Sequence, residues 1–320
     1  MIGKQVRLVL GILFSVAILV ACAKSTEIVS LPLPSTDTQV LETKTPLKPT
    51  ATQVPATKIP DSAEAYNNRG LDYYNNGDWD RAISDYDQAI KLNPNLAEAY
   101  VNRGLIFLRQ GDLDRAISDL DRAVQIKPDY AEAYNNRGLA YFHKGDLDRA
   151  INDYDQAIQF NPDLSNAYLN RGNAYYGIGQ LDRAIRDYDK AIHLDPNFAD
   201  AYYQRGFLSN DKGDWDRAIS DYDQAIQLDP NMADAYINRG IAYANKDDLV
   251  SAIRDWDQGI QLDPNFAVPY YYRGIAYGIQ GDKQAAIADF NKVLELCGIN
   301  TQLCQAAQEG LQQLGGEQSP

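Results

Sequence analysis

Residues 131–164 read AEAYNNRGLAYFHKGDLDRAINDYDQAIQFNPDL, and the 34 residues before them, 97–130, read AEAYVNRGLIFLRQGDLDRAISDLDRAVQIKPDY. The chain aligns with itself at this period seven times, in units that begin at Ala63, Ala97, Ala131, Ser165, Ala199, Ala233 and Ala267. A unit this short cannot bury its apolar face alone, so neighbouring units must stack on one another. The sequence therefore predicts one array over 63–300, where length alone suggests two ordinary domains.

Residues within each unit have helical spacing. With the first residue of a unit as position 1, position 4 is Tyr and position 8 is Gly in all seven units. In the first unit a second set occupies positions 20, 21, 24, 27 and 28, namely Ala82, Ile83, Tyr86, Ala89 and Ile90. Steps of one, three, four and seven residues place side chains on one helix face. Each unit is therefore predicted to contain two helices.

The residues between these sets are typical of helix ends. Gly77 is expected to end the first helix of its unit, and Asp78 to cap the second. Pro94 then stops the second helix. Each unit is thus predicted to be a helical hairpin.

These residues resemble the tetratricopeptide repeat (TPR), with Tyr, Gly, Tyr, Ala, Tyr, Ala and Pro at its signature positions over 63–300. The resemblance implies an all-α fold, a right-handed superhelical α-solenoid of seven helix-turn-helix units. It also implies that first helices line a concave groove and second helices lie outside. Members of the family bind proteins or peptides, and the repeat itself implies no enzymatic activity.

The seventh unit departs from the pattern at its end. Gly298 stands where Pro is expected, and Tyr272 replaces the amide that most units have at position 6. We expect a terminal unit, covered by a capping helix from Thr301 to Leu314 within the last segment, 301–320. Such a cap covers the apolar face that has no further repeat to stack on it.

Position 7, usually Leu in the family, is Arg in every unit: Arg69, Arg103, Arg137, Arg171, Arg205, Arg239 and Arg273. A buried guanidinium is costly unless it is paired. Position 23 is Asp in every unit: Asp85, Asp119, Asp153, Asp187, Asp221, Asp255 and Asp289. We predict that each Arg pairs with one such Asp, from its own or the adjoining unit. The alternative is an Arg row that binds an acidic partner.

Position 2 is acidic in five units: Glu64, Glu98, Glu132, Asp200 and Asp234. These acids either form a row at the groove or cap the first helices. The spacings from Asp61 to Glu64, from Asn95 to Glu98 and from Asp129 to Glu132 are those of a capping box. We favour capping.

Position 6 carries an amide in six units: Asn68, Asn102, Asn136, Asn170, Gln204 and Asn238. It lies off the apolar stripe, and the family resemblance places it at the groove, like the asparagine ladder of some superhelical members. Amides offer donors and an acceptor to a peptide backbone without reading side chains. Apolar residues run alongside at position 9: Leu71, Leu105, Leu139, Phe207 and Ile241, interrupted by Asn173. We predict that these residues bind a partner peptide; the alternative is that the amides only bond neighbouring helices.

The first 21 residues have the pattern of a bacterial lipoprotein signal. Lys4 and Arg7 precede an apolar run of about 13 residues, too short for a membrane span. Leu19-Val20-Ala21-Cys22 resembles the lipobox, which implies cleavage before Cys22, a diacylglyceryl group on its thiol and acylation of the new amino terminus. An ordinary signal peptide with an incidental Cys is the alternative. Residues 22–62, rich in Pro and Thr, are predicted to be a disordered tether.

Few residues are available for other chemistry. Cys297 and Cys304 are expected to form a disulfide if the protein lies outside the cytoplasm, with free buried thiols as the alternative. With three Cys and two His in all, and no catalytic grouping of Ser, His, Asp or Cys, we expect neither a metal or cofactor site nor enzymatic activity. A net charge of −14 argues against nucleic-acid binding.

These features predict a scaffold on the extracytoplasmic side of a bacterial membrane, held by lipid at Cys22 and binding extended peptide or protein partners in the groove. The alternative function is a structural envelope protein whose solenoid self-associates. The acidity is assigned mainly to the scaffold, because many of its acids lie on the turns and second helices.

Overall fold

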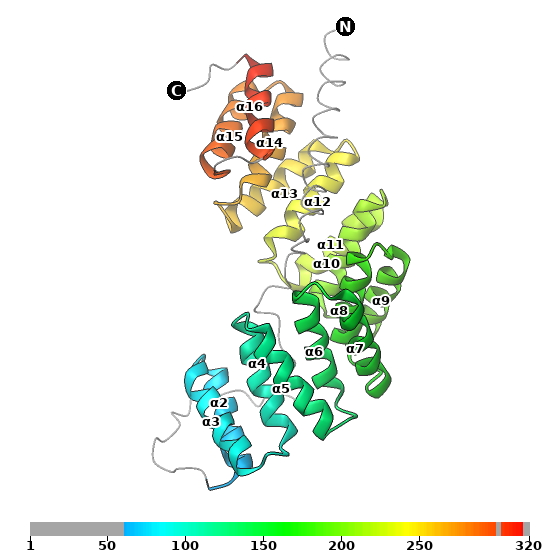
Figure 1. The fold of residues 1–320 in the computed structure, drawn as a ribbon. Coiled ribbons are helices and arrows are strands. Elements are labelled where there is room, and N and C mark those ends of the chain that lie inside the picture. The colour runs from blue at the N-terminus through cyan, green and yellow to red at the C-terminus, as the bar shows by residue number, and fades with distance from the viewer. Residues whose placement is uncertain (1–60, 299–301, 316–320) are drawn as a thin grey trace. The chain divides into compact units, whose positions relative to one another are not determined.

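The computed structural model describes residues 61–298 and 302–315, which form helices and turns with no strand in those ranges (Figure 1). The signal segment, Cys22, the tether up to residue 60 and Thr301 lie outside the described residues. The chain divides into two compact units and passes from one to the other between Leu194 and Asp195.

The first unit contains four helical pairs, one for each of the first four repeats. First helices begin at position 1 of the repeat and second helices at position 17, in the order α2 Ala63–Asn75, α3 Trp79–Leu92, α4 Ala97–Arg109, α5 Leu113–Ile126, α6 Ala131–His143, α7 Leu147–Phe160, α8 Ser165–Gly177 and α9 Leu181–Leu194. The helical hairpins predicted from the 34-residue period are therefore confirmed for these repeats.

The second unit contains three further pairs and a last helix. They are α10 Ala199–Asp211, α11 Trp215–Leu228, α12 Ala233–Asn245, α13 Leu249–Leu262, α14 Ala267–Gln280, α15 Lys283–Leu296 and α16 Gln302–Leu314. Leu311 and Ala307 of α16 are buried, and Gly310 lies against the ring of Phe290 of α15. Helix α16 also contacts α14, so it covers the end of the seventh repeat as expected of a capping helix.

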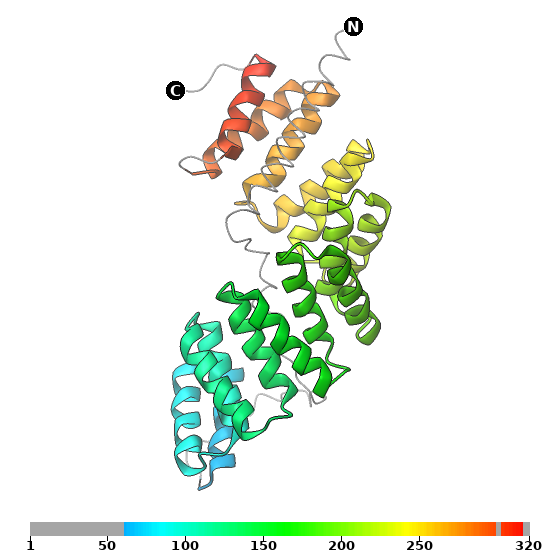
Figure 2. The same ribbon diagram turned by 45° about the vertical axis from the view of Figure 1, so that its right-hand side comes forward.

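The pairs stack in chain order within each unit, as both views show (Figures 1 and 2). The second helix of one repeat contacts the first helix of the next, as α3 with α4, α5 with α6 and, in the second unit, α11 with α12. Successive first helices also touch, as α4 with α6. The fold is therefore an all-α solenoid of helical pairs, in which each repeat is buried by its neighbours.

The core of each hairpin is an aromatic or aliphatic side chain at position 24 against the glycine at position 8. Tyr86, Tyr154, Tyr188 and Tyr222 are fully buried there, as is Trp256. A Cβ atom on Gly138 would lie only 2.8 Å from the ring of Tyr154. The two helices of a hairpin approach this closely because position 8 has no side chain.

The turns inside the hairpins follow the predicted pattern. Gly77 has a φ of +76°, and the Asp78 side chain accepts a hydrogen bond from the backbone N–H of Arg81. In the sixth repeat Asp247 takes the place of this glycine with a φ of +63°, the one such non-glycine residue in the described ranges. Asp tolerates the left-handed conformation better than most residues, but at a cost.

The predicted capping boxes are wrong. Helix α2 is capped by Ser62, and α4 and α6 begin after Leu96 and Tyr130, which make no side-chain cap bond. The polar residue of the turn lies further back: the side chain of Asn93 accepts from the backbone N–H of Asn95. An apolar residue before the helix is favoured because it enters the core, as Leu164 does. The acids at position 2 are therefore not engaged in capping.

Candidate partner-binding surface

The invariant arginines are held by carboxylates. Arg137 donates from Nε and Nη2 to the two carboxylate oxygens of Asp153, at 2.8 and 2.6 Å. Equivalent pairs join the Arg at position 7 and the Asp at position 23 of the same repeat in all seven repeats, namely Arg69–Asp85, Arg103–Asp119, Arg137–Asp153, Arg171–Asp187, Arg205–Asp221, Arg239–Asp255 and Arg273–Asp289. The prediction of internal pairing is confirmed.

Guanidinium groups in both units also bond a second carboxylate, at position 25 of the preceding repeat. The pairs are Arg103–Asp87, Arg137–Asp121, Arg171–Asp155, Arg239–Asp223 and Arg273–Asp257. Each such Arg therefore links its own hairpin to the one before it. Because each of the seven guanidinium groups is occupied by at least one carboxylate, they do not form a free row for an acidic partner.

The electrostatics of these pairs follow from burial. Burial raises the pKa of Asp153 above its ordinary value, although the Arg137 guanidinium pulls it down. The hydrogen bonds that Arg273 donates to Asp289 hold the pKa of Arg273 above its usual range. The tyrosine at position 4 lies beside the same Arg, with the Arg137 guanidinium carbon 5.3 Å from the Tyr134 ring centroid. These rings therefore pack within the scaffold.

Asn102, Asn170 and Asn238, three of the amides at position 6, bond the preceding first helix. Asn102 donates from Nδ2 to Oδ1 of Asn67 at 3.0 Å, and Asn170 donates to Oδ1 of Asn135 at 3.1 Å. In the second unit Asn238 donates to the hydroxyl of Tyr203 at 3.0 Å. In each case the acceptor is at position 5 of the preceding repeat. The structure thus forms the inter-helix bonds that were the alternative to peptide binding.

Each of these bonds uses only one of the hydrogen-bonding groups of the amide. The carbonyl oxygens of Asn102 and Asn170 accept no hydrogen bond from the described residues, and an Asn has two N–H donors. The inter-helix bond fixes the orientation of the side chain and leaves an acceptor. Peptide binding by this row remains a prediction.

The other predicted partner-binding residues differ in exposure. Leu71 is 41% exposed and Asn68 is also exposed, both on α2. Leu139, Phe207 and Ile241 are half-buried, whereas Leu105, Asn136 and Gln204 are buried. All lie on first helices, so the structure brings them to one set of elements in each unit, with the most accessible members at the first repeat.

Family models agree with this architecture. Models described as tetratricopeptide repeat match residues 67–131, 120–152, 233–266 and 268–300, and one described as TPR repeat matches 139–179, 172–209 and 210–247. The chain belongs to the tetratricopeptide repeat family. This family fold is a scaffold suited to protein–protein interaction, and TPR proteins are generally non-enzymatic.

Solved TPR structures share the fold. A tetratricopeptide repeat protein from Parabacteroides merdae is 23% identical with a TM-score of 0.56, over 80% of this chain and all of that one. PilF of Pseudomonas aeruginosa is 17% identical with a TM-score of 0.61, over 68% and 97% of the two chains. The Cut9–Hcn1 structure of the APC/C is 18% identical with a TM-score of 0.66, over 79% of this chain and 50% of that chain. No curated protein matches the TPR chain.

One polar residue of the TPR core was not given a role by the sequence. Asn173 interrupts the apolar position 9, and its Oδ1 accepts a 2.9 Å hydrogen bond from the hydroxyl of Tyr188. The hydroxyls of Tyr86, Tyr154 and Tyr222, at the same position as Tyr188, are buried without a partner. A polar residue in an otherwise apolar position was the available signal, because such residues usually satisfy a buried group.

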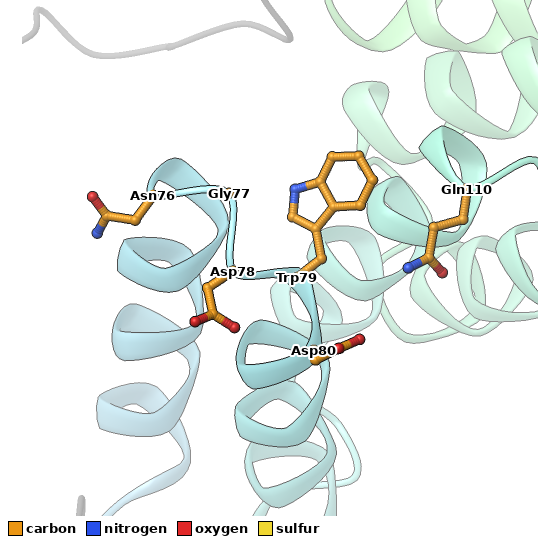
Figure 3. Close-up of a pocket in the computed structure, with 6 residues that line it drawn as sticks. All are labelled: Asn76, Gly77, Asp78, Trp79, Asp80 and Gln110. Atoms are coloured by element: carbon orange, nitrogen blue, oxygen red, sulfur yellow. The ribbon is translucent and has the colours of Figure 1, made fainter.

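A small open indentation lies at the first TPR turn, between α2 and α3 (Figure 3). Its volume is about 430 Å³, and it is lined by Asn76, Gly77, Asp78, Trp79, Asp80 and Gln110. The Trp79 ring stands between the turn and Gln110 of the next repeat, and the Asp78 carboxylate is occupied by Arg81. These groups combine no nucleophile with a base, so the indentation has the features of a turn and not of an active site.

The two C-terminal cysteines lie together in the TPR structure. Cys297, at the end of α15, and Cys304, in α16, have Cα atoms 5.8 Å apart and their sulfurs are joined as a disulfide. This Cα separation is within the usual range for such a bridge. The bridge would tie the capping helix to the last repeat.

In 61–298 and 302–315, no three His, Cys, Asp or Glu side chains are placed to hold a metal ion together. None of the helices in this part of the TPR chain has the length and apolar character to span a bilayer.

Proposed function

We propose that this TPR protein is a lipid-anchored scaffold on the extracytoplasmic side of a bacterial membrane, and that its first helices bind extended peptide segments of partner proteins. The observation that carries the proposal is the amide row at position 6. Its members Asn102 and Asn170 are oriented by bonds to the preceding first helix and have carbonyl oxygens that accept nothing from the described residues.

The chemistry of the row suits a peptide backbone. An extended peptide presents N–H and C=O groups at regular intervals and loses its bonds to water on binding. Amides that are already fixed in direction can replace these bonds with little further loss of side-chain freedom. The apolar residues one helical turn further on, such as Leu71 and Leu139, would contact side chains of the partner.

The anchor is supported by the sequence around Cys22. The basic start, the apolar run and Leu19-Val20-Ala21-Cys22 together match a lipoprotein signal. Several acyl chains on one residue would hold the protein stably at a membrane. Residues 23–60 would then separate the repeats from the bilayer.

The peptide-binding part is tested with a variant of the amide row. Asn102, Asn136 and Asn170 are changed together to Ala, and partners captured from cell-envelope proteins are compared with those of the wild type. The control changes three exposed turn asparagines, Asn95, Asn231 and Asn265, to Ala. We expect capture to fall only in the first variant. Unchanged capture would show that the row merely bonds neighbouring helices, and capture of further copies of the chain alone would favour self-association.

The anchor is tested by the mass of the amino-terminal peptide. Protein from the native membrane should begin at Cys22 and carry the added mass of a diacylglyceryl group and an acyl chain. Cys22→Ser should be released from the membrane fraction. Cleavage at another residue without added lipid would indicate an ordinary signal peptide.

A further inference from the structure

The acids at position 2 lie one helical turn before the amides at position 6. Residues four apart are neighbours on a helix surface. The Nδ2 atom of Asn238 also reaches back over this turn and donates to the backbone carbonyl of Asp234 at 3.0 Å. The row formed by Glu64, Glu98, Glu132, Asp200 and Asp234 therefore shares a helix face with the amide row.

Most other acids of the repeats are neutralised within the scaffold. Those at positions 23 and 25 pair with arginines, and those at position 16 cap second helices, as Asp78 and Asp112 do. By contrast, Glu64, Glu98, Glu132 and Asp200 form no ion pair with the described residues, and they do not cap their helices. The helix face with the amides thus carries unneutralised negative charge.

Asp200 is the unusual member of this row. Asp200 is only 7% exposed, and its Oδ2 atom has no hydrogen-bond partner among the described residues. Burial and the neighbouring Asp229 raise its pKa to about 6. An ionised carboxylate that is buried without a partner is costly. The missing partner is a donor, and a positively charged donor would restore most of the lost interaction.

Further negative charge surrounds this carboxylate. Burial raises the pKa of the Tyr203 hydroxyl, and the carboxylates of Asp234 and Asp200 are close enough to raise this pKa further. The same hydroxyl accepts the hydrogen bond from Asn238. Asp200 on α10 and Asp234 on α12 therefore lie near the hydrogen bond between Tyr203 and Asn238, which joins these two helices.

The geometry selects the kind of cation. Three acids are near one another, but no group in the described residues is placed to hold a metal ion. A recessed carboxylate is better reached by a long side chain, which carries its charge at the end of an apolar stem. Such stems belong to Lys and Arg.

We infer that the carboxylate of Asp200, with Asp234 and Asp229 beside it, receives a Lys or Arg side chain of the peptide bound along α10 and α12. This inference rests on the proposed peptide-binding function and makes it specific, since it assigns basic segments as the partners of the second unit. A neutral or acidic residue at that place in the peptide leaves Asp200 unpaired.

The test uses the full chain and two labelled decapeptides, alternating Ser-Lys and alternating Ser-Gln, with binding followed by fluorescence anisotropy at 150 mM salt. We expect the Lys peptide to bind more tightly, and Asp200→Asn to weaken it by about tenfold or more while leaving the Gln peptide unchanged. The variant should melt at or above the temperature of the wild type, because it removes a buried unpaired charge. A binding loss of this kind is therefore not a folding defect.

Two control variants separate a local site from general charge attraction. Asp80→Asn removes an exposed acid of the first unit, and Glu64→Gln removes an exposed member of the same row. Both should change the affinity for the Lys peptide less than twofold. If either weakens it as much as Asp200→Asn does, the attraction is long-range and the inference is wrong.

The outcomes also distinguish this inference from the proposed function. Equal binding of both peptides, lost in the variant with Asn102, Asn136 and Asn170 changed to Ala, would overturn the basic site and keep the peptide-binding groove. Absence of binding by either peptide would overturn both.

Discussion

Arg137 and Asp153 form a two-point ion pair that joins the two helices of the third repeat. The Asp153 side chain is 3% exposed, whereas Asp121, the second partner of Arg137, is 43% exposed. One guanidinium thus links a buried carboxylate in its own repeat to a solvated one in the repeat before. The two bonds should contribute very differently to stability.

We expect Arg137→Met to lower the free energy of unfolding by about 3 kcal/mol, because it leaves Asp153 buried without a counter-charge. Asp121→Asn should cost less than about 1 kcal/mol, as exposed ion pairs do. Urea unfolding followed by circular dichroism measures both. The double variant Arg137→Met/Asp153→Leu should recover most of the loss. Equal costs for Arg137→Met and Asp121→Asn would contradict this account.

Gly138→Ala should destabilise the protein by about 1–3 kcal/mol, because the new Cβ would lie 2.8 Å from the Tyr154 ring and 3.1 Å from the Ala150 carbonyl oxygen. In an exposed helix the same change would be favourable by about 1 kcal/mol. Gly104→Ala is the matched control, since its nearest neighbour is Leu120 at 3.2 Å. It should be better tolerated in thermal unfolding, and a larger loss at Gly104 would refute the steric explanation.

Asp247→Gly should stabilise the sixth repeat by about 0.5–1 kcal/mol, because Asp247 has a φ of +63° that glycine adopts without strain. The reverse change, Gly145→Asp, places Asp in the equivalent turn at a φ of +78° and should destabilise by a similar amount. Both are read from the urea midpoint. The prediction fails if the two substitutions shift the midpoint in the same direction.

The disulfide of Cys297 and Cys304 should stabilise the docking of α16. Closing so short a loop contributes roughly 2 kcal/mol. We expect Cys297→Ser to reduce the hydrogen-exchange protection of α16 while α4 and α6 keep theirs. Peptide mass spectrometry of protein from its native compartment should find the two residues bridged; finding both as free thiols would favour the alternative.

Asp200→Asn should gain stability over the wild type as the pH rises. The folded pKa of Asp200, about 6, lies above the value of about 3.9 for an unfolded Asp. Folding therefore favours the protonated form, and the wild type loses stability as this carboxyl ionises beside Asp229, Asp234 and Tyr203.

Between pH 5 and 7.5 the advantage of Asp200→Asn should grow by about 1 kcal/mol. Thermal midpoints at the two pH values measure it. Asp78→Asn is a useful contrast, because its hydrogen bonds with Arg81 lower the pKa of Asp78. The stability that the Asp78 carboxylate contributes to the wild type is fully present above the unfolded pKa of about 3.9. The difference between the wild type and Asp78→Asn should therefore not change between pH 5 and 7.5. If the thermal midpoints of the wild type and Asp200→Asn differ by the same amount at both pH values, Asp200 does not titrate in this range.

The sequence by itself determined the repeats and their helices. The 34-residue period placed every first helix at position 1, from Ala63 to Ala267, because helical spacing and the turn residues Gly and Asp are local signals. Pairing between positions 7 and 23 was also predictable, since a charged residue on an apolar stripe requires a partner. The cap helix followed from the need to cover the last repeat.

Only the tertiary structure decided which groups meet across the repeats. It showed that Leu96 precedes α4 where a capping box was expected, that Asn102, Asn170 and Asn238 bond position 5 of the preceding repeat, and that Asn173 accepts a hydrogen bond from the hydroxyl of Tyr188. It also separated Asp200, buried and unpaired, from the exposed Glu64 and Glu98 at the same position. Residues at the same position of different repeats lie at the same place on their own helices, but they have different neighbours. Burial and pairing depend on those neighbours, which lie a full repeat away in the chain.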